Sequence, residues 1–343
     1  MMPFKGFWGN LKSPIIGLSP MDGVTDAPYR HMICKYSKPS LVMTEFCNVE
    51  GLARGAVSML KEFLYSEMER PIVAQIYGVE LDSFYKVALM CCYLDFDGID
   101  INMGCPANKV ARRGSGAGMI KMPDHARKVI QTVKRAAQDW ADGIDLEEAG
   151  IRTKIITALQ KIRTNEPKRR LLPVSVKTRI GYDEIVTEKW ISTLAEEQPA
   201  NITLHGRTFR QMYLGEANWD EIAKAAKICR QAGITLLGNG DVRSMEDAKT
   251  KIKTYGVDGV LVGRSTMGNP WFFGKHEPTQ EERFQVAIEH SRYFEEKHMD
   301  HAFFAMRKHL SWYCRGFDGA RETRVKLMQS NSSDEVEAIL LQK

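Results

Sequence analysis

The sequence of 343 residues contains no apolar run near the roughly 18 residues that a membrane-spanning helix needs. Its first ten residues, MMPFKGFWGN, lack the apolar core of a secretory leader. The seven cysteines are scattered and odd in number, and no C-x-x-C pair or zinc spacing occurs. These absences predict a cytoplasmic protein with free thiols, no membrane contact and no bound metal.

A strong charge imbalance is also lacking. Lys and Arg number 48 against 43 Asp and Glu, which gives a formal charge of +5. This excess does not identify a polyanion binder, although a local basic patch would be compatible with one. With 43% hydrophobic and 27% charged residues the composition argues against disorder and predicts a globular chain.

What the sequence does contain is an alternation of short apolar segments with longer helical patterns. We expect strands near 14–19, 40–45, 71–77, 97–102, 173–178, 201–205, 235–239 and 258–263. Helical patterns lie at 26–36, 82–94, 123–138, 184–198, 219–232 and 244–255, with a weaker one at 48–64. Eight such units predict an α/β fold, a (β/α)8 TIM barrel. The alternative, an open doubly wound sheet, normally has a Gly-rich turn after its first strand, where this chain has Pro20-Met21-Asp22-Gly23.

Two segments depart from a minimal barrel. We expect the barrel over 1–277, with a helical insertion near 140–170 that ends in the basic run Lys168-Arg169-Arg170. That run is either a solvated helix end or a contact for an anionic partner. After the barrel we expect a small all-helical domain over 278–343, with an apolar stripe at Phe303, Met306, Leu310 and Tyr313.

The segment 301–326 mixes six Lys or Arg with His309, Trp312 and Tyr313. Basic residues among aromatic ones suit phosphate contacts and base stacking, although an ordinary amphipathic helix shows the same mixture.

Residues that are mostly polar follow each expected strand, and a barrel builds its active site from such strand ends. They are Met21, Asp22, Glu45, Gln75, Tyr77, Asn102, Cys105, Lys177, Arg179, His205, Arg207, Asn239, Gly240, Asp241, Gly263 and Arg264.

The ends of the seventh and eighth strands suggest a bound phosphate. Asn239-Gly240-Asp241 and Gly263-Arg264 stand where such barrels commonly hold one. Lys177 fits either a Schiff-base lysine or a cation beside an electron-rich cofactor ring. The amide of Gln75 can donate and accept together, which suits a flavin ring edge, so the set favours FMN over a sugar phosphate.

Cys105, between Gly104 and Pro106 after the fourth strand, has three interpretations. It could be a buried structural thiol, a nucleophile with His205 as its base, or a neutral general acid. Its position at a strand end favours a catalytic role.

Several motifs resemble those of the tRNA-dihydrouridine synthases. They are SPMDGVTDAPYR (19–30), TEF (44–46), AQIYG (74–78), GIDINMGCPANKV (98–110), GSGAGMI (114–120), VSVKTRIG (174–181), ITLHGRT (202–208), GNGDV (238–242) and VGRSTMGNPWFF (262–273). RKHLSWYCRG (307–316) resembles the C-terminal helical domain of this family more loosely.

The resemblance implies FMN-dependent reduction of uridine in tRNA to 5,6-dihydrouridine, with NADPH as reductant. Reduced flavin would deliver hydride to uracil C6, and Cys105 would protonate C5. The flavin would contact Pro20, Met21, Asp22, Gln75, Lys177, His205, Asn239, Gly240, Asp241, Gly263 and Arg264. Asn102 and Arg179 would face the uracil. We also expect Lys308 and Arg315 of the helical domain to contact the tRNA, and the protein to be a monomer.

The chain departs from many family members at Ser19 and Asp22, where alanine is common, and in the long insertion. Two other functions are compatible with the residues. One is an FMN barrel that acts on a free pyrimidine, which would not need the basic helices. The other is a tRNA-binding factor without turnover.

Overall fold

The computed structural model describes residues 2–107, 111–297 and 303–341. One parallel sheet forms its centre, in the order β1-β9-β8-β7-β6-β5-β4-β2, with β3 also paired to β4. The strands are β1 (Ile15–Leu18), β2 (Val42–Met43), β3 (Cys47–Asn48), β4 (Ile72–Tyr77), β5 (Gly98–Met103), β6 (Val174–Arg179), β7 (Asn201–His205), β8 (Thr235–Asn239) and β9 (Gly259–Val262).

The sheet closes on itself. The N–H of Leu18 donates to the carbonyl of Leu41 at 3.0 Å, and that of Ser40 donates to Ile16 at 2.9 Å. The predicted (β/α)8 barrel is therefore confirmed, with β2 and β3 sharing one of its eight positions. The single strand expected over 40–45 is shorter than predicted, because the hydroxyl of Thr44 accepts the N–H of Gln75 where the ladder would otherwise continue.

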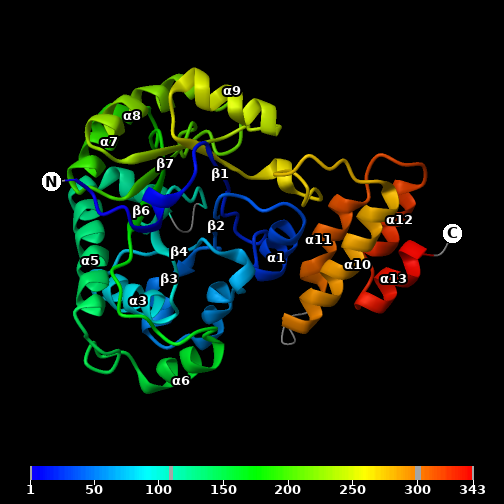
Figure 1. Cartoon of the computed structure of the whole chain (residues 1–343), viewed down its shortest axis with the longest axis horizontal. Helices are drawn as coiled ribbons and strands as arrows, with labels where there is room; N and C mark the ends of the chain where they lie inside the picture. Colours follow the sequence, from blue (N-terminus) through cyan, green and yellow to red (C-terminus); the bar gives the residue numbers. More distant parts are fainter. Residues whose placement is uncertain (1, 108–110, 298–302, 342–343) are drawn as a thin grey trace.

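Helices surround the barrel (Figure 1). They are α1 (Ala27–Tyr36), α2 (Val49–Ala53), α3 (Leu81–Tyr93), α5 (Pro123–Ala141), α6 (Thr153–Ile162), α7 (Thr187–Glu196), α8 (Trp219–Gln231) and α9 (Met245–Tyr255). The helix expected over 48–64 is instead α2 followed by the 3-10 helix η2 (Val57–Phe63), since Gly55 between them has a φ of 102°. Side-chain caps begin several helices: Asp26, Asn218 and Ser244 each accept a backbone N–H of the first turn.

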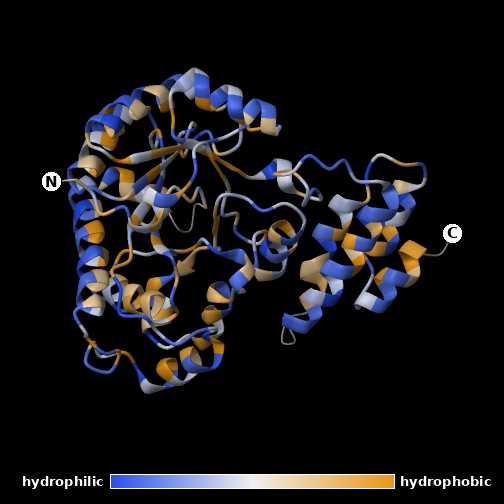
Figure 2. Ribbon diagram, in the orientation of Figure 1, coloured by the Kyte–Doolittle hydropathy of each residue, from blue (hydrophilic) through white to orange (hydrophobic). Residues whose placement is uncertain are grey.

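The C-terminal helices form a second unit with its own core (Figures 1 and 2). These helices are α10 (Gln280–Lys297), α11 (Phe304–Tyr313), α12 (Ala320–Leu327) and α13 (Ser333–Leu341). The predicted stripe of Phe303, Met306, Leu310 and Tyr313 lies in that core, together with Trp271. His309 and Tyr313 are 1% and 2% exposed, so the interpretation that they stack on bases is wrong: tertiary packing uses their rings inside the domain.

The helical unit packs on the barrel through α1 and α10 (Figure 1). Glu289 of α10 accepts hydrogen bonds from Lys35 at 2.5 Å and from the Tyr36 hydroxyl at 2.7 Å. Deeper in the junction, the Tyr29 hydroxyl and Thr266 Oγ1 are 2.8 Å apart.

The basic run of the insertion makes contacts within the chain. Lys168 and Arg170 each lie 3.0 Å from a carboxylate oxygen of Asp95, which is 1% exposed. The guanidinium of Arg169 lies 3.9 Å from the Trp140 ring centre. The buried carboxylate of Asp95 thus pairs with Lys168 and Arg170, while the Lys168 side chain stays 64% exposed. Asp95 precedes β5, so this network lies at the N-terminal end of the barrel, away from the strand ends that carry the site.

No helix in the described ranges is both long and apolar enough to cross a membrane. Within those same ranges, no group of three or more His, Cys, Asp or Glu side chains is arranged to hold a metal ion.

Candidate active site

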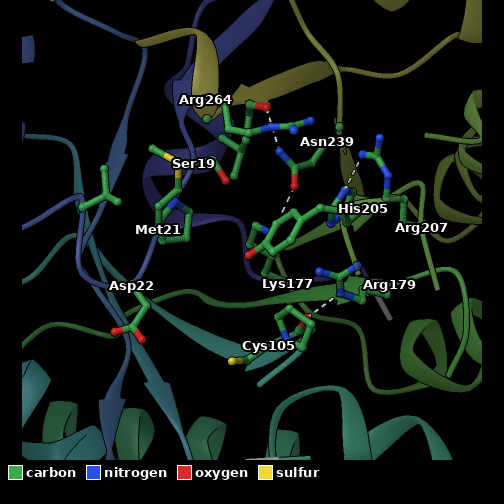
Figure 3. A pocket seen from close by; sticks show the side chains of 18 of the residues that line it. Ser19, Met21, Asp22, Cys105, Lys177, Arg179, His205, Arg207, Asn239 and Arg264 are labelled. Carbon is green, nitrogen blue, oxygen red and sulfur yellow. Dashed lines mark hydrogen bonds between the residues drawn. The ribbon is translucent and has the colours of Figure 1, made fainter. Parts of the chain in front are cut away.

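A cavity of about 840 Å³ opens at the C-terminal ends of the strands (Figure 3). It brings together most residues predicted from the strand ends. They are Pro20, Met21, Asp22, Asn102, Cys105, Lys177, Arg179, His205, Asn239, Gly240, Asp241, Gly263 and Arg264.

The other predicted site residues lie elsewhere. Gln75 is fully buried and bonded to Asn102, so it supports the cavity from outside its lining. Lys308 and Arg315 belong to the helical unit; the amine of Lys308 donates to the Ala305 carbonyl, and Arg315 is exposed. Glu45 is also outside the lining, and burial raises its pKa to about 9.

A chain of buried hydrogen bonds holds Cys105 in place. Asn102 Oδ1 accepts the backbone N–H of Gly104 at 3.0 Å and of Cys105 at 2.9 Å, and Asn102 Nδ2 donates to Gln75 at 2.9 Å. Gln75 in turn donates to Asp100 at 2.7 Å. These hydrogen bonds hold the side-chain amides of Asn102 and Gln75 in place, and Asn102 in turn fixes the backbone that precedes the Cys105 thiol.

The surroundings keep the Cys105 side chain as a thiol. Burial raises the pKa of Cys105, and the charge of Asp22 raises it further, although Arg179 and Lys177 oppose both effects. Figure 3 shows the sulfur and the Asp22 carboxyl group facing the same open space. Burial also raises the pKa of Asp22 itself. Among the described cysteines, Cys105 alone lines the cavity.

Lys177 and Asn239 form part of the cavity wall. The Lys177 ammonium donates to Asn239 Oδ1 at 3.2 Å, and Asn239 Nδ2 donates to the Leu261 carbonyl at 2.9 Å. Burial lowers the pKa of Lys177 to about 8, and the nearby charge of Arg179 contributes to the shift. The lysine therefore presents a cation whose proton is easily given up, inside a pocket that excludes much solvent.

Arg179 joins two loops at the cavity. Its Nε donates to the Gly104 carbonyl at 2.7 Å, and its Nη1 donates to the carbonyls of Thr208 at 3.2 Å and Met212 at 3.3 Å. One side chain thus connects the segment that carries Cys105 to the segment after β7.

A second polar group lies on the β7 and β8 side. Asp241 accepts from Arg264 at 2.7 Å and from Arg207 at 2.6 Å, and these contacts help to hold the pKa of its carboxyl group low. Arg207 also lies 3.3 Å from His205 Nε2. Arginine can only donate, so Nε2 is the acceptor, and burial lowers the pKa of His205 well below its usual value. The imidazole is therefore neutral, with its proton on Nδ1.

Two glycines leave room beside these groups. Gly240 has a φ of 121°, and a Cβ there would lie 2.7 Å from Ala217 and 3.1 Å from His205. A Cβ at Gly263 would lie 3.1 Å from the Met21 sulfur. Larger residues at either position would displace the cavity wall.

The chain matches a known family over nearly its whole length. The family model described as dihydrouridine synthase matches residues 17–140 and 148–343. The chain belongs to the dihydrouridine synthase family.

Curated relatives of this dihydrouridine synthase family member have similar lengths. A probable tRNA-dihydrouridine synthase of Staphylococcus aureus strain COL is 34% identical over 346 residues, covering 98% of this chain and 95% of the relative. A probable tRNA-dihydrouridine synthase 2 of Bacillus subtilis strain 168 is 32% identical, covering 98% and 96%. Among solved structures, that of DHODH in complex with ferulenol from Eimeria tenella gives a TM-score of 0.48 at 13% identity, covering 82% and 81%.

Sequence reasoning gave no role to several residues of the cavity wall in this family member. They are Val24, Phe46, Met212, Tyr213, Val242, Arg243, Leu261, Ser265 and Met267, besides backbone of the Cys105 segment. Arg207, which was grouped with the strand ends, and Ser19 also line the cavity. No sequence signal pointed to Met212 and Tyr213, because only the folded loop returns them to the cavity.

Proposed function

We propose that this chain catalyses the FMN-dependent reduction of uridine in tRNA to 5,6-dihydrouridine, with NADPH as the reductant. The observation that carries the proposal is a single cavity thiol, Cys105, on a backbone fixed by Asn102 and with a raised pKa. Barrel residues 1–277 would hold the cofactor, and the helical residues 278–343 would contact the RNA. Family membership supports the substrate class.

The residues of the cavity fit FMN. The Arg264 guanidinium and the space beside Gly263 and Gly240 offer charge and close backbone approach to a phosphate. Lys177 and Asn239 offer donors to the oxygen- and nitrogen-rich edge of a flavin ring, and Met21 and Leu261 offer apolar contact. Bound flavin supplies the hydride that uracil C6 receives.

Each protein group then has a defined task. Cys105 gives the proton of its thiol to uracil C5, which it can do because the thiol is neutral near pH 7. Arg179 and Asn102 hold the Cys105 segment from either side, and both line the cavity that would receive the uracil. Asp241 orients Arg207 and Arg264, and neutral His205 and cationic Lys177 line the cofactor cavity.

The first test uses the purified protein. We expect a yellow preparation with an absorption band near ~450 nm, which is typical of bound flavin. With NADPH and unmodified tRNA, nucleoside mass spectrometry should detect uridines that have gained two hydrogens. Cys105→Ala should lower product formation by about 100- to 10,000-fold, the usual contribution of a general acid, while NADPH still reduces the flavin.

Cys34→Ala is the matched control, because Cys34 is a buried cysteine of α1 outside the cavity. It should retain full activity. A colourless protein whose cellular role survives Cys105→Ala would instead indicate a tRNA-binding factor. Faster turnover of free pyrimidines than of tRNA would indicate a small-molecule reductase.

A further inference from the structure

The loop between β7 and α8 exposes consecutive large side chains at the cavity mouth. Met212, Tyr213 and Leu214 are 39%, 60% and 76% exposed, and we call them the 212–214 ridge. Met212 and Tyr213 also line the cavity, so the ridge is continuous with the proposed active site. Apolar side chains displayed beside a site are typical of a surface that contacts a ligand.

The ridge stands on a fixed backbone. Arg207, 2% exposed, donates to the carbonyls of Leu214 at 3.4 Å and Gly215 at 2.5 Å. Arg179, 3% exposed, donates to the Met212 carbonyl at 3.3 Å. Met212 has a φ of 49°, a left-handed conformation that a non-glycine residue keeps only where its surroundings enforce it.

The base of the loop is anchored as well. The rings of Phe209 and Tyr182 stack at 4.2 Å, and the N–H of Phe209 donates to the Gly181 carbonyl. The Lys121 ammonium lies 3.7 Å from the Tyr182 ring centre. The exposed side chains are therefore held in place before any ligand binds, which lowers the entropy cost of a contact.

Charge around the ridge favours a polyanion. Arg210 and Arg243 flank it with side chains 78% and 79% exposed. Their carboxylate partners, Asp183 and Glu216, lie at 3.9 and 3.7 Å, which makes these pairs weak and easily exchanged for phosphates. An apolar wedge between arginines fits RNA bases and their backbone better than it fits an apolar protein surface.

We propose that the 212–214 ridge packs against the nucleotides beside the target uridine and replaces the stacking lost when that base enters the cavity. This inference rests on the proposed function. Apolar side chains inserted at an unstacked step stabilise a displaced base in other nucleic-acid complexes. Arg179 fixes the position of the ridge relative to Cys105, because it donates hydrogen bonds to the carbonyls of both Met212 and Gly104.

The test compares Leu214→Ser on two substrates. One is folded tRNA, and the other is a short single-stranded oligoribonucleotide with the same sequence around the uridine that the wild type modifies. We expect kcat/KM to fall about tenfold on tRNA, a size typical of the loss of one buried leucine side chain, and to stay near wild type on the oligonucleotide, where little stacking is lost. A 2-aminopurine placed next to the uridine in tRNA should brighten on binding to the wild type and less with the variant.

Met68→Ser is the control, since Met68 is 45% exposed in the 3-10 helix η3 (Glu67–Glu69), which precedes β4 at the end of the barrel opposite the cavity. NADPH-driven reduction of the flavin should be unchanged in both variants, which shows that each is folded and loaded. An equal loss of kcat/KM on both substrates, or no loss on tRNA, would overturn the proposed role of the ridge. A wild type that makes no dihydrouridine in tRNA would overturn the proposed function instead, before any variant is compared.

Discussion

At the scale of single residues, the two sides of the cavity differ in charge. Arg179, Arg207 and Arg264 come from the strand ends of β6, β7 and β9, whereas Asp22 follows β1 and faces Cys105 (Figure 3). Positive charge would favour a thiolate, and Asp22 opposes it. The Asp22 carboxylate therefore raises the pKa of the Cys105 thiol beyond the effect of burial alone.

Asp22→Asn should therefore lower the pKa of Cys105, because it removes a nearby negative charge that disfavours the thiolate. The pH dependence of iodoacetamide labelling of the Cys105 peptide measures this value without reference to turnover. Because the proposed reaction uses the neutral thiol, the alkaline limb of the activity profile should move to lower pH as well. Asp82→Asn, on the exposed face of α3, should change neither. A labelling midpoint that stays in place or rises would contradict the effect of Asp22.

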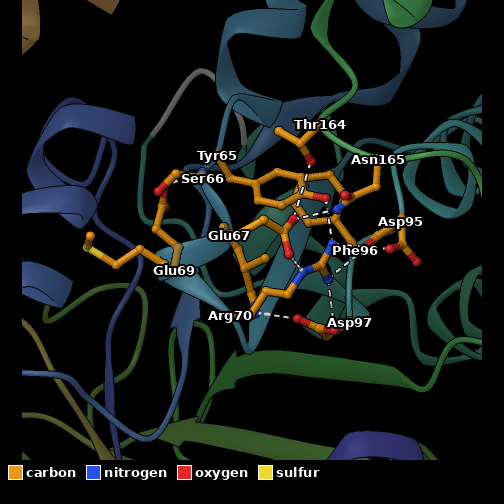
Figure 4. A network of polar contacts seen from close by, with 12 residues as sticks. Tyr65, Ser66, Glu67, Glu69, Arg70, Asp95, Phe96, Asp97, Thr164 and Asn165 are labelled. Carbon is orange, nitrogen blue, oxygen red and sulfur yellow. Dashed lines mark hydrogen bonds and ion pairs between the residues drawn. The ribbon is translucent and has the colours of Figure 1, made fainter.

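At the scale of elements, a single carboxylate joins the insertion to the barrel (Figure 4). Asp95, before β5, accepts from Arg70, Lys168 and Arg170, which precede β4 and β6. Thr164 and Asn165, after α6, reach Glu67 of the same network. The network secures the long fourth crossover at the end of the barrel opposite the cavity, so we assign it a structural role.

Removing the carboxylate in Asp95→Ala should lower the free energy of unfolding by about 1.5–3 kcal/mol, because Arg70, Lys168 and Arg170 lose a shared charged hydrogen-bond acceptor. Urea denaturation measures this, and Asp95→Asn provides a milder variant if the first does not accumulate. The control is Asp82→Ala, which breaks an exposed pair with Lys86 and should cost at most about 1 kcal/mol. Equal effects of the two alanine variants would show that the network contributes no more than a surface pair.

At the scale of the whole molecule, the junction between barrel and helices contains a buried imidazole. His309 is 1% exposed, and within the described chain neither ring nitrogen has a hydrogen-bond partner. Its ring centre lies 5.3 Å from that of Tyr29 on the barrel side. Burial lowers the pKa of His309 well below its usual value, so the folded protein holds it neutral.

Acid should weaken the fold through this residue. The unfolded chain binds a proton near pH 6.5 and the folded chain does not, so stability is complete above that value and is lost as pH falls below it. His309→Phe should match the wild type or exceed it at pH 7.5, and should lose less on acidification to pH 5. Urea midpoints at the two pH values measure this. His276→Gln, at an exposed histidine, is the control and should keep the wild-type pH dependence of stability. A His309→Phe variant that also kept the wild-type pH dependence would contradict the prediction.

The exposed cations of the helical unit belong to the same scale. Arg307 and Arg324 donate to backbone carbonyls, whereas Arg315 is exposed. Arg315→Ala should weaken tRNA binding and reduce the slope of log K against log salt by about one. For Lys308→Ala we expect the same direction with a smaller slope change, since that amine is half-buried near Asp26 and Glu45. Binding titrations across salt concentrations measure both, with Lys227→Ala on the outer face of α8 as the control. Unchanged slopes would remove the helical unit from the RNA contact.

The sequence by itself determined the barrel and most of the polar residues that line its cavity. Short β-branched runs at regular spacing can bury both faces only as strands of a covered parallel sheet, and such a sheet brings every strand end to one mouth. That is why the sequence alone is enough to group Cys105, Lys177, Arg179 and His205 at one site.

Only the tertiary structure decided which of these groups are free and which are used. The amides of Gln75 and Asn102 are engaged beneath Cys105, Lys168 and Arg170 pair with Asp95, and His309 and Tyr313 lie in a core. The 212–214 ridge could not be predicted from the sequence either, because arginines at the ends of two strands fix its backbone. Local periodicity specifies the position of a side chain on its strand or helix, but its interaction partner is set by contacts between segments far apart in the chain.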